Sequence, residues 1–429
     1  MKFPTDSKAC EPFLRLIRSN SEADGECGIV RTSPDERGSS AFIDRLFPRI
    51  FGDFFVEVDM SHEKYMKAAL KLAENGLGFV DPNPMVGAVI VRSGEIIGRG
   101  YHHRCGELHA ERNAFADCDS RGIDCSGADM YVTLEPCCHY GKTPPCTEAI
   151  IEHKIKRVFI GSADPNPLVA GKGVKILRDN GIEVTENVLR RECDELNEIF
   201  FHYITSRTPF VTMKYAMTMD GKIACYTGKS KWITGEAARN NVHRERLKHS
   251  AIMIGIGTVL ADDPMLTCRL ENGRDPIRII CDTHLRIPLD CNIVKTAKEV
   301  TTIIATSSGN AEKRRALCEL SCNTIVVGEK NGHIDLNELM TELSSLEINS
   351  ILLEGGGELN WSMLNAGFVN KIQTYIAPKI FGGENAKSPV SGIGFAFPDE
   401  AAILYDTKIK RIGEDILIES RVKNVHGNN

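Results

Sequence analysis

The sequence predicts an α/β protein with two layered domains, and three observations lead to this fold class. The chain has 429 residues, more than a single hydrophobic core usually serves, so two domains plus an extension are expected. Short segments rich in β-branched residues alternate with helical patterns, which is typical of α/β layers. A polar stretch at 203–208 separates two such series, so we expect the domains to occupy 60–205 and 206–429.

The first series predicts a helix that begins near Ser61 and a sheet packed against it. Tyr65, Ala69 and Leu72 recur at helical spacing. The expected strands are 86–91, 96–101, 130–134, 157–162 and 182–184, and the expected helices are 109–117, 144–153 and a segment through 177. This order of strands and helices predicts one layered α/β domain.

The second series predicts a mixed sheet. Its strand candidates are 210–216, 251–255, 277–282, 300–305, 324–327 and 350–354, with helical stretches at 236–247, 311–320 and 336–346 between them. Two further strands, at 371–377 and 416–420, follow near the C-terminus. Together they favour a sheet with an antiparallel edge.

Composition limits the class of protein and its partners. Hydrophobic residues make up 42% and charged residues 26% of the chain, as in ordinary globular proteins. The net charge of −6 argues against a nucleic-acid backbone as the main partner. No apolar run reaches the length of a membrane span. Fifteen cysteines, an odd number scattered without a secretory signal, favour a reducing cytoplasm.

Residues 1–59 differ from the rest of the chain. They lack clear periodicity, and their acidic residues outnumber the basic ones, unlike a transit peptide. We expect a disordered or loosely attached extension, which includes the possibility that translation starts at Met60. A small docking segment built on Phe51, Phe54 and Phe55 is the alternative.

The most informative motif joins His109 and Glu111 to Cys137 and Cys146. Two thiolates and one imidazole suit Zn²⁺ and leave the fourth tetrahedral position for water. Glu111 stands two residues from His109, close enough to move a proton without acting as a ligand. The motif predicts hydrolytic deamination. A closed structural site with Cys138 as fourth ligand is the alternative, although adjacent cysteines rarely chelate one small ion comfortably.

The spacing of the two cysteines narrows this interpretation. Zinc nucleobase deaminases carry the pattern His-x-Glu…Pro-Cys-x-x-Cys, whereas eight residues separate Cys137 from Cys146 here. The block at 133–146, Thr-Leu-Glu-Pro-Cys-Cys-His-Tyr-Gly-Lys-Thr-Pro-Pro-Cys, resembles the deaminase of bifunctional riboflavin-biosynthesis deaminase–reductases. The resemblance implies a cytidine-deaminase-like fold. It also implies substrate contacts from four residues, with Lys142 at the phosphate: Asn83, His102, Lys142 and Asn166.

Two of these residues lie in a repeated tetrapeptide. Asp-Pro-Asn-Pro occurs at 81–84 and again at 164–167. An Asn side chain can donate and accept hydrogen bonds at once, which fits the edge of a pyrimidinone. Turn chemistry alone is the alternative, because prolines on both sides of Asn restrict the backbone.

The second half resembles the dihydrofolate-reductase-like domain of the same bifunctional family. Four blocks in order carry the resemblance, at 213–222, 230–234, 257–264 and 353–358. The last includes Gly355, Gly356 and Gly357 after an apolar strand, where backbone N–H groups can approach a phosphate. A tight strand–helix turn would explain such a loop equally well on its own, and it is not the Rossmann fingerprint.

The resemblance implies two groups of residues in this half. The NADPH contacts it implies are Met217, Trp232, Thr258, Asp262, Thr283 and Gly355–Gly357. The substrate contacts are Ser230, Arg246, Leu266, Arg269 and Glu354, with the two arginines as candidates for the substrate phosphate. Lys214 and Glu354 are polar residues on apolar strands and could assist the proton transfer that accompanies reduction. A satisfied buried ion pair explains them nearly as well.

These observations lead to the expected function. By resemblance, the protein uses Zn²⁺ to deaminate 2,5-diamino-6-ribosylamino-4(3H)-pyrimidinone 5′-phosphate and NADPH to reduce the ribose of the resulting 5-aminouracil. We expect small-molecule pyrimidine ribotides as partners, a homo-oligomer, and no nucleic acid or membrane. An RNA-editing deaminase with a C-terminal RNA-binding module is the alternative. The negative charge and 7% aromatic content oppose it. A third possibility is that one half is degenerate and supports the other.

Overall fold

The computed structural model describes residues 60–141 and 143–423, so the extension expected at 1–59 and Lys142 lie outside the described residues. The first sheet has the strand order β2-β1-β3-β4-β5. Its strands are β1 (Gly87–Arg92), β2 (Glu95–Tyr101), β3 (Asp129–Leu134), β4 (Arg157–Ser162) and β5 (Glu183–Thr185). β1 runs antiparallel to β2 and β3, whereas β3, β4 and β5 are parallel. The carboxyl ends of β3 and β4 therefore meet the start of β1 at one edge of the sheet.

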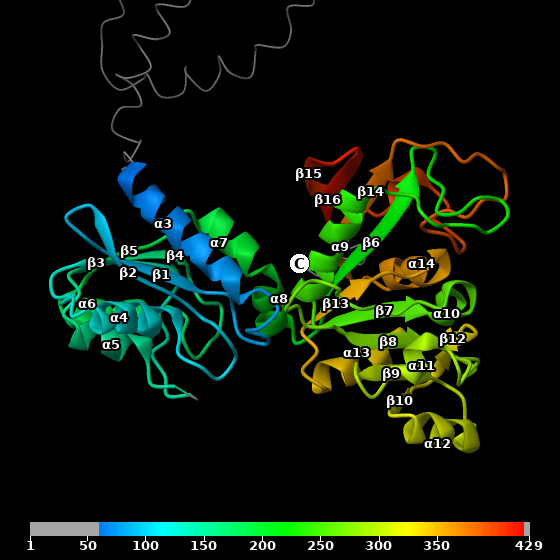
Figure 1. The fold of residues 1–429 in the computed structure, drawn as a ribbon, viewed down its shortest axis with the longest axis horizontal. Helices are drawn as coiled ribbons and strands as arrows, with labels where there is room; N and C mark the ends of the chain where they lie inside the picture. The colour runs from blue at the N-terminus through cyan, green and yellow to red at the C-terminus, as the bar shows by residue number, and fades with distance from the viewer. Residues whose placement is uncertain (1–59, 142, 424–429) are drawn as a thin grey trace, which may run out of the picture. The chain divides into compact units, whose positions relative to one another are not determined.

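Helices cover both faces of this sheet, as Figure 1 shows. The helices of this half are α3 (Met60–Ala73), η1 (Glu74–Gly76), α4 (Ala110–Ser120), α5 (Cys146–Glu152), α6 (Lys172–Asp179) and α7 (Arg190–Leu196). α3 and α7 pack with Val89 and Val91 of β1 on one face. α4, α5 and α6 pack with Ala88 and Ile90 on the other face. The two-residue period of a strand thus builds two cores from one apolar run, and the expected layered α/β domain is confirmed.

The second sheet has nine strands in the order β10-β9-β8-β7-β13-β6-β14-β16-β15. They are β6 (Phe210–Thr218), β7 (Ala251–Gly255), β8 (Ile277–Cys281), β9 (Thr302–Thr306), β10 (Cys322–Val326), β13 (Ser350–Leu353), β14 (Val369–Ala377), β15 (Leu404–Ile412) and β16 (Asp415–Val422). The strands from β10 to β14 are parallel, and β16 and β15 pair antiparallel at one end. The expected mixed sheet with an antiparallel edge is therefore confirmed.

Helices also flank this sheet (Figure 1). They are α8 (Glu198–Ser206), α9 (Glu236–Lys248), α10 (Ile256–Asp262), α11 (Asn292–Lys295), α12 (Ala311–Glu319), α13 (Leu336–Ser345), α14 (Gly357–Asn365) and η2 (Pro398–Glu400), with a small hairpin of β11 (Glu329–Lys330) and β12 (His333–Ile334). α13 and α14 bury Leu339 and Met363 against one face of the parallel strands. α10, α11 and α12 pack around Ile254 and Ile280 on the other face. Within the described residues, no helix is long and apolar enough to cross a membrane.

The polar stretch expected to separate the domains belongs to a helix instead. α8 runs from Glu198 to Ser206 and ends where Arg207 takes a left-handed conformation with φ 56°. Ile199 and Tyr203 are buried on its inner face, and the Tyr203 hydroxyl donates a hydrogen bond to the Ser344 carbonyl at 3.2 Å. Tertiary burial therefore outweighs the polar composition of this segment. The boundary near residue 205 stays a prediction.

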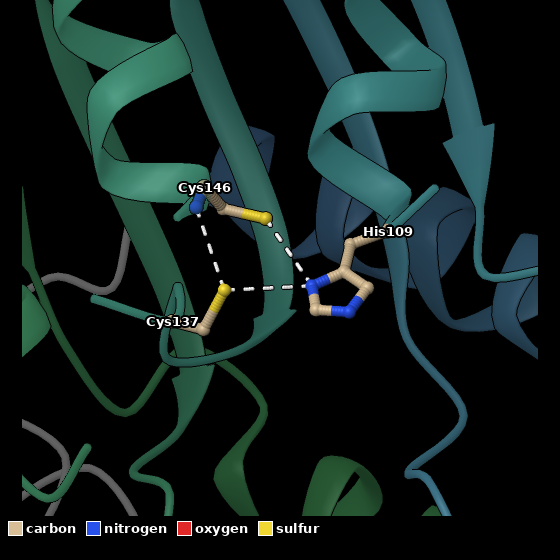
Figure 2. A group of neighbouring side chains, drawn as sticks. All are labelled: His109, Cys137 and Cys146. Atoms are coloured by element: carbon tan, nitrogen blue, oxygen red, sulfur yellow. Dashed lines mark hydrogen bonds between the residues drawn. The ribbon is translucent and has the colours of Figure 1, made fainter. Parts of the chain in front are cut away.

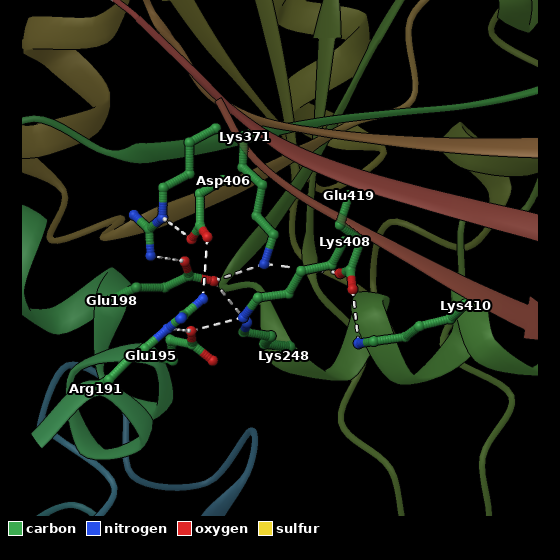
Figure 3. A network of polar contacts seen from close by, with 10 residues as sticks. Arg191, Glu195, Glu198, Lys248, Lys371, Asp406, Lys408, Lys410 and Glu419 are labelled. Atoms are coloured by element: carbon green, nitrogen blue, oxygen red, sulfur yellow. Dashed lines mark hydrogen bonds and ion pairs between the residues drawn. The ribbon is translucent and has the colours of Figure 1, made fainter. Parts of the chain in front are cut away.

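A buried carboxylate ties α8 to the second sheet. Glu198 accepts from Lys248 of α9 at 3.2 Å, from Lys371 of β14 at 3.0 Å and from Arg421 of β16 at 2.9 Å. Burial alone would raise the pKa of Glu198, but the three cations hold it at about 2. Figure 3 shows that Glu198 and Lys371 lie at the centre of a wider network of charged side chains. Because α8 directly follows α7 along the chain, this network joins the segment between the two sheets to the second sheet.

Candidate active sites

Three separate elements bring the predicted zinc ligands together (Figure 2). His109 is the N-cap residue of α4, with extended backbone at φ −74° and ψ 167°. Cys137 follows the carboxyl end of β3, and Cys146 is the first residue of α5. Among the described residues, these three form the group whose ligand atoms lie close enough to hold a metal ion, all within 4.8 Å of one another.

The spacing of the ligand atoms fits Zn²⁺. The His109 Nδ1 atom lies 3.4 Å from the Cys137 Sγ atom and 3.4 Å from the Cys146 Sγ atom. Tetrahedral Zn–N and Zn–S bonds of about 2.0 and 2.3 Å separate such atoms by about 3.5 Å. His109 would therefore bind through Nδ1. The carboxylate of Glu111 is not part of the ligand group, in agreement with three protein ligands and an open fourth position.

Hydrogen bonds prepare Cys137 to bind as a thiolate. Its Sγ atom accepts from the Cys146 backbone N–H at 3.4 Å. A hydrogen bond from the Cys146 thiol is the main cause that lowers the pKa of Cys137 to about 4, and His109 contributes to the same shift. Since a metal binds the thiolate form, this environment favours the ligand state.

Glu111 lies in the first turn of α4 and is 3% exposed. Burial is the main cause that raises the pKa of its carboxyl. A raised pKa makes the protonated carboxyl easier to form than in an ordinary Glu, which favours a group that takes up and passes on a proton. The position and surroundings of Glu111 therefore suit a general acid and base.

The structure adds Thr143 to the site, a residue that the sequence reasoning missed. Its hydroxyl lies 3.3 Å from the His109 Nε2 atom, the nitrogen that faces away from the thiols. A partner on this nitrogen fixes the orientation and the tautomer of a ligating imidazole. Thr143 lies between Cys137 and Cys146 in the sequence, and this position is the signal by which sequence reasoning would have found it.

The two predicted substrate residues Asn83 and His102 contact each other. The Asn83 Nδ2 atom lies 3.1 Å from the His102 Nε2 atom, and the His102 Nδ1 atom lies 3.1 Å from the Leu108 carbonyl. Because a carbonyl only accepts, the His102 proton sits on Nδ1, and Nε2 accepts from Asn83. Burial lowers the pKa of His102, which favours this neutral form. His102 is 3% exposed, so it orients Asn83, and its own contact with substrate stays a prediction.

Asn166 lies in a loop that is held by a buried carboxylate, Glu135. Glu135 accepts from the backbone N–H groups of Asp164 at 3.4 Å, Gly171 at 3.0 Å and Val174 at 3.3 Å. Because β3 and β4 are parallel, the Cys137 and Asn166 segments leave the same edge of the sheet. The topology therefore brings Asn166 to the side of the sheet that carries the zinc ligands.

In the second half, parallel topology gathers the predicted cofactor residues. Met217 is near the end of β6, Thr258 follows β7, Thr283 follows β8, and Gly355 follows β13. The carboxyl ends of these neighbouring parallel strands share one edge, which is where α/β sheets bind ligands. Glycine is required at two positions of the loop. A Cβ on Gly355 would lie 2.7 Å from the Asn360 Oδ1 atom, and one on Gly357 would lie 2.6 Å from the Ser391 Oγ atom.

At the same edge, Lys214, Arg246 and Glu354 form an ion cluster. The Glu354 carboxylate accepts from the Arg246 Nε and Nη2 atoms at 2.8 and 3.1 Å, and the Lys214 Nζ atom lies 3.8 Å away. Burial opposes the charge of Glu354, but Arg246 and Lys214 lower its pKa to about 2. The sequence predicts that the Arg246 guanidinium binds the substrate phosphate. In the structure, two of its nitrogens already donate to the Glu354 carboxylate. Its remaining Nη1 atom donates to the Thr267 carbonyl at 2.9 Å. A phosphate contact from Arg246 stays a prediction.

The other predicted residues of this half differ in exposure. Trp232 is 61% exposed, with the Arg239 guanidinium 4.7 Å from its ring centroid. Arg269 and Asp262 are exposed, while Ser230 is half-buried. Leu266 is 4% exposed and packs in the core below α10, so its side chain has little surface to offer a substrate. The roles of these residues stay predictions.

Comparison with known families gives a match to each half. The family model of the cytidine and deoxycytidylate deaminase zinc-binding region matches residues 59–162. The model of the RibD C-terminal domain matches residues 209–418. The two matches lie on either side of α7 and α8.

Whole-chain relatives carry both halves together. The chain is 52% identical to the riboflavin biosynthesis protein RibD of Actinobacillus pleuropneumoniae over 373 residues, 87% of this chain and 98% of that protein. It is 38% identical to the RibD of Escherichia coli, covering 84% of this chain and 99% of that protein. The solved structure of a diaminohydroxyphosphoribosylaminopyrimidine deaminase/5-amino-6-(5-phosphoribosylamino)uracil reductase from Thermotoga maritima is 38% identical. It aligns with a TM-score of 0.74 over 85% of this chain and 99% of that chain.

Proposed function

The chain belongs to the RibD family of riboflavin biosynthesis proteins, and on this premise we propose the substrates and the role of each site residue. It is a bifunctional deaminase and reductase that uses Zn²⁺ and NADPH. The first site deaminates 2,5-diamino-6-ribosylamino-4(3H)-pyrimidinone 5′-phosphate. The second reduces the ribosyl group of 5-amino-6-(5-phosphoribosylamino)uracil to the ribityl group. The observation that carries the first step is Glu111, a buried carboxyl in the same turn as the ligand His109.

At the first site, Zn²⁺ held by His109, Cys137 and Cys146 supplies Lewis-acid chemistry that makes water a nucleophile at neutral pH. Glu111 accepts a proton as the nucleophile attacks the amino-bearing ring carbon. It delivers this proton to the ring nitrogen, then accepts the remaining proton of the former water and passes it to the departing ammonia. Asn83, oriented by its hydrogen bond to His102, binds the edge of the pyrimidinone ring. Asn166 and Lys142 bind the remainder of the nucleotide.

At the second site, NADPH supplies the hydride. Gly356, the N-cap residue of α14, has open space where a Cβ would lie, so its backbone can approach a phosphate at the start of this helix. Arg269 is exposed, and its guanidinium binds the substrate phosphate. When the bond between C1′ and the ribose ring oxygen breaks during reduction, the Lys214 ammonium, whose pKa is lowered by burial, gives a proton to that oxygen. Glu354 and Arg246 fix the position of Lys214 through the ion cluster.

Incubation of the purified protein with the diaminopyrimidine ribotide tests both steps. Without NADPH, we expect mass spectrometry to show the deaminated product and one equivalent of ammonia. With NADPH, we expect the mass of the ribityl product and stoichiometric oxidation of the cofactor. Deamination without any reduction would show that the second half is degenerate. The RNA-editing alternative predicts retention on tRNA and none on an NADP-analogue resin, and family membership does not favour it.

We also propose a homo-oligomer located in the cytoplasm. β15 ends the nine-stranded sheet, so among the described strands its outer edge has no partner. Its Tyr405 and Ile409 side chains are 50% and 70% exposed. Apolar side chains on an open strand edge suit pairing with a second copy of the chain. Light scattering during size-exclusion chromatography tests this, with Ile409→Lys expected to shift the mass toward the monomer. The thirteen cysteines of the described residues are all free, as expected in a reducing compartment.

A further inference from the structure

The loop that carries Asn83 is bound by residues of the second half. Asp81, two residues before Asn83, has a partner for each carboxylate oxygen. The Arg274 Nη2 atom donates to its Oδ2 atom at 3.1 Å, and the Asn349 Nδ2 atom donates to its Oδ1 atom at 3.3 Å. Arg274 lies before β8 and Asn349 lies before β13. Two segments of the reductase half therefore meet on one carboxylate of the deaminase half.

The Arg274 guanidinium spans the loop as well as the carboxylate. Its Nε atom donates to the Gly78 carbonyl at 2.8 Å. Gly78 has φ +79°, and a Cβ there would lie 2.5 Å from the Leu247 side chain of α9. The loop thus packs against the reductase half where it begins. At its other end, Asn197 holds both the N–H and the carbonyl of Met85, at 2.8 and 2.9 Å.

The second partner of Asp81 is oriented by its own surroundings. Asn349 is 2% exposed. Its Oδ1 atom accepts from the Ser250 hydroxyl at 3.0 Å and from the Ser350 hydroxyl at 2.9 Å. Because the oxygen is taken by two donors, the amide nitrogen must face Asp81. This contact is therefore part of a built arrangement and not an accident of two surface side chains.

Between these fixed points, Asn83 has little freedom. Its backbone N–H donates to the Val80 carbonyl at 2.8 Å, and its side chain donates to His102. We propose that Arg274 and Asn349 of the reductase half are positioning residues for deamination, because they hold the loop that presents Asn83 to the pyrimidine. The reductase half then contributes to the deaminase reaction through structure as well as by using its product. This inference rests on the proposed deaminase function.

The ion pair itself adds little to folding. The Arg274 and Asp81 side chains are 35% and 27% exposed, and ion pairs so accessible to water are weak. Loss of Arg274 should therefore leave the fold and the reductase intact, while the loop shifts. A displacement of about 1 Å of a substrate-positioning group can reduce catalysis by up to about a hundredfold.

The test compares Arg274→Ala with a matched control, Lys408→Ala. Lys408 of β15 pairs with Glu195 of α7 at 2.6 Å, and the exposures are 36% and 33%. The Lys408→Ala substitution thus removes an ion pair between the same two halves and leaves the loop that carries Asn83 unchanged. Steady-state ammonia release gives KM and kcat for deamination. NADPH oxidation with the deaminated intermediate gives the reductase rate, and zinc content is measured for each protein.

For Arg274→Ala we expect the KM for deamination to rise roughly tenfold, with zinc content and reductase rate unchanged. Arg274→Lys keeps the positive charge but lacks the guanidinium that donates from two nitrogens, so its KM for deamination should rise less than that of Arg274→Ala. Lys408→Ala should behave as wild type. If Arg274 acts through Asn83, the double variant Arg274→Ala/Asn83→Ala should be no worse than Asn83→Ala alone.

Each other outcome has a distinct meaning. An unchanged KM in Arg274→Ala, or fully additive effects in the double variant, would overturn the positioning role. Equal losses in Arg274→Ala and Lys408→Ala would also overturn it, because a general loosening of the halves would then explain both. Failure of the wild-type protein to release ammonia would instead refute the proposed deaminase function.

Discussion

The Arg246 guanidinium holds both carboxylate oxygens of Glu354, at 2.8 and 3.1 Å. Arg246 belongs to α9 and Glu354 follows β13, so the pair joins two elements more than a hundred residues apart. Because the same carboxylate faces the Lys214 ammonium, it sets the charge state of the group proposed to donate the proton in reduction. The pair is thus both a structural link and an electrostatic one.

We predict that Glu354→Gln slows reduction and shifts its pH profile. Burial lowers the pKa of Lys214, and Glu354 opposes this shift. Without the negative charge, the pKa of Lys214 falls further, so the protonated fraction is lost at lower pH. The basic limb of NADPH oxidation should therefore move to lower pH, with kcat reduced roughly ten- to hundredfold. Ammonia release should not change. Glu342→Gln, at an exposed position in α13, is the control, and a basic limb that stays in place would contradict the role of Lys214.

Glu111→Gln should separate the two activities. Glutamine keeps the shape of the side chain but cannot accept the proton, so kcat for ammonia release should fall by about 10²–10⁴. Zinc content should remain, because the ligand group consists of His109, Cys137 and Cys146. Reduction of the deaminated intermediate should also continue. Glu152→Gln, on the exposed side of α5, serves as control. Ammonia release at the wild-type rate would remove Glu111 from the mechanism.

Substitutions at Gly356 test the phosphate loop. A Cβ at this position meets no atom within 4 Å, and φ is −74°, so a side chain is sterically acceptable. Gly356→Asp places a negative charge beside the expected phosphate and should weaken NADPH binding at least tenfold by calorimetry, roughly the effect of 1.4 kcal/mol. Gly356→Asn has nearly the same volume without the charge and should lose much less affinity. Equal affinities in the two variants would refute a phosphate at this loop, and zinc content should not change in either.

The Glu198 network should govern stability at acidic pH. Its pKa of about 2 lies below the ordinary Glu value of 4.5, so ionised Glu198 stabilises the folded protein above pH 4.5. This stabilisation is lost as the pH falls from about 4.5 toward 2. Glu198→Gln leaves Lys248, Lys371 and Arg421 without their central anion and should lower the free energy of unfolding at pH 7 by about 2–4 kcal/mol.

Denaturant unfolding at several pH values measures this effect. The difference between wild type and Glu198→Gln should shrink as the pH approaches 2, because wild-type Glu198 becomes protonated. Glu186→Gln removes a partner of an exposed ion pair with Arg178 and is the matched control, with a much smaller effect expected. A difference that does not vary with pH would show that the carboxylate charge of Glu198 is not the cause.

Much of the fold was predictable because its signals are local. Strand β7 lies at the predicted residues, Ala251–Gly255, since an apolar β-branched run between polar segments needs no distant information. The zinc ligands were equally clear, because thiolate and imidazole chemistry restricts which residues can serve. The helix α8 was missed, since its polar residues are helical only because Ile199 and Tyr203 are buried against other elements.

The sequence by itself determined the chemistry of the first site, the α/β character of both halves and the antiparallel edge of the second sheet. These depend on residue type and short-range spacing. The tertiary structure alone decided that Thr143 backs His109, that Arg246 holds Glu354, and that Arg274 reaches Asp81 from 193 positions away. Such partners come together only after strands from distant parts of the chain have paired. No local pattern in the sequence encodes that proximity.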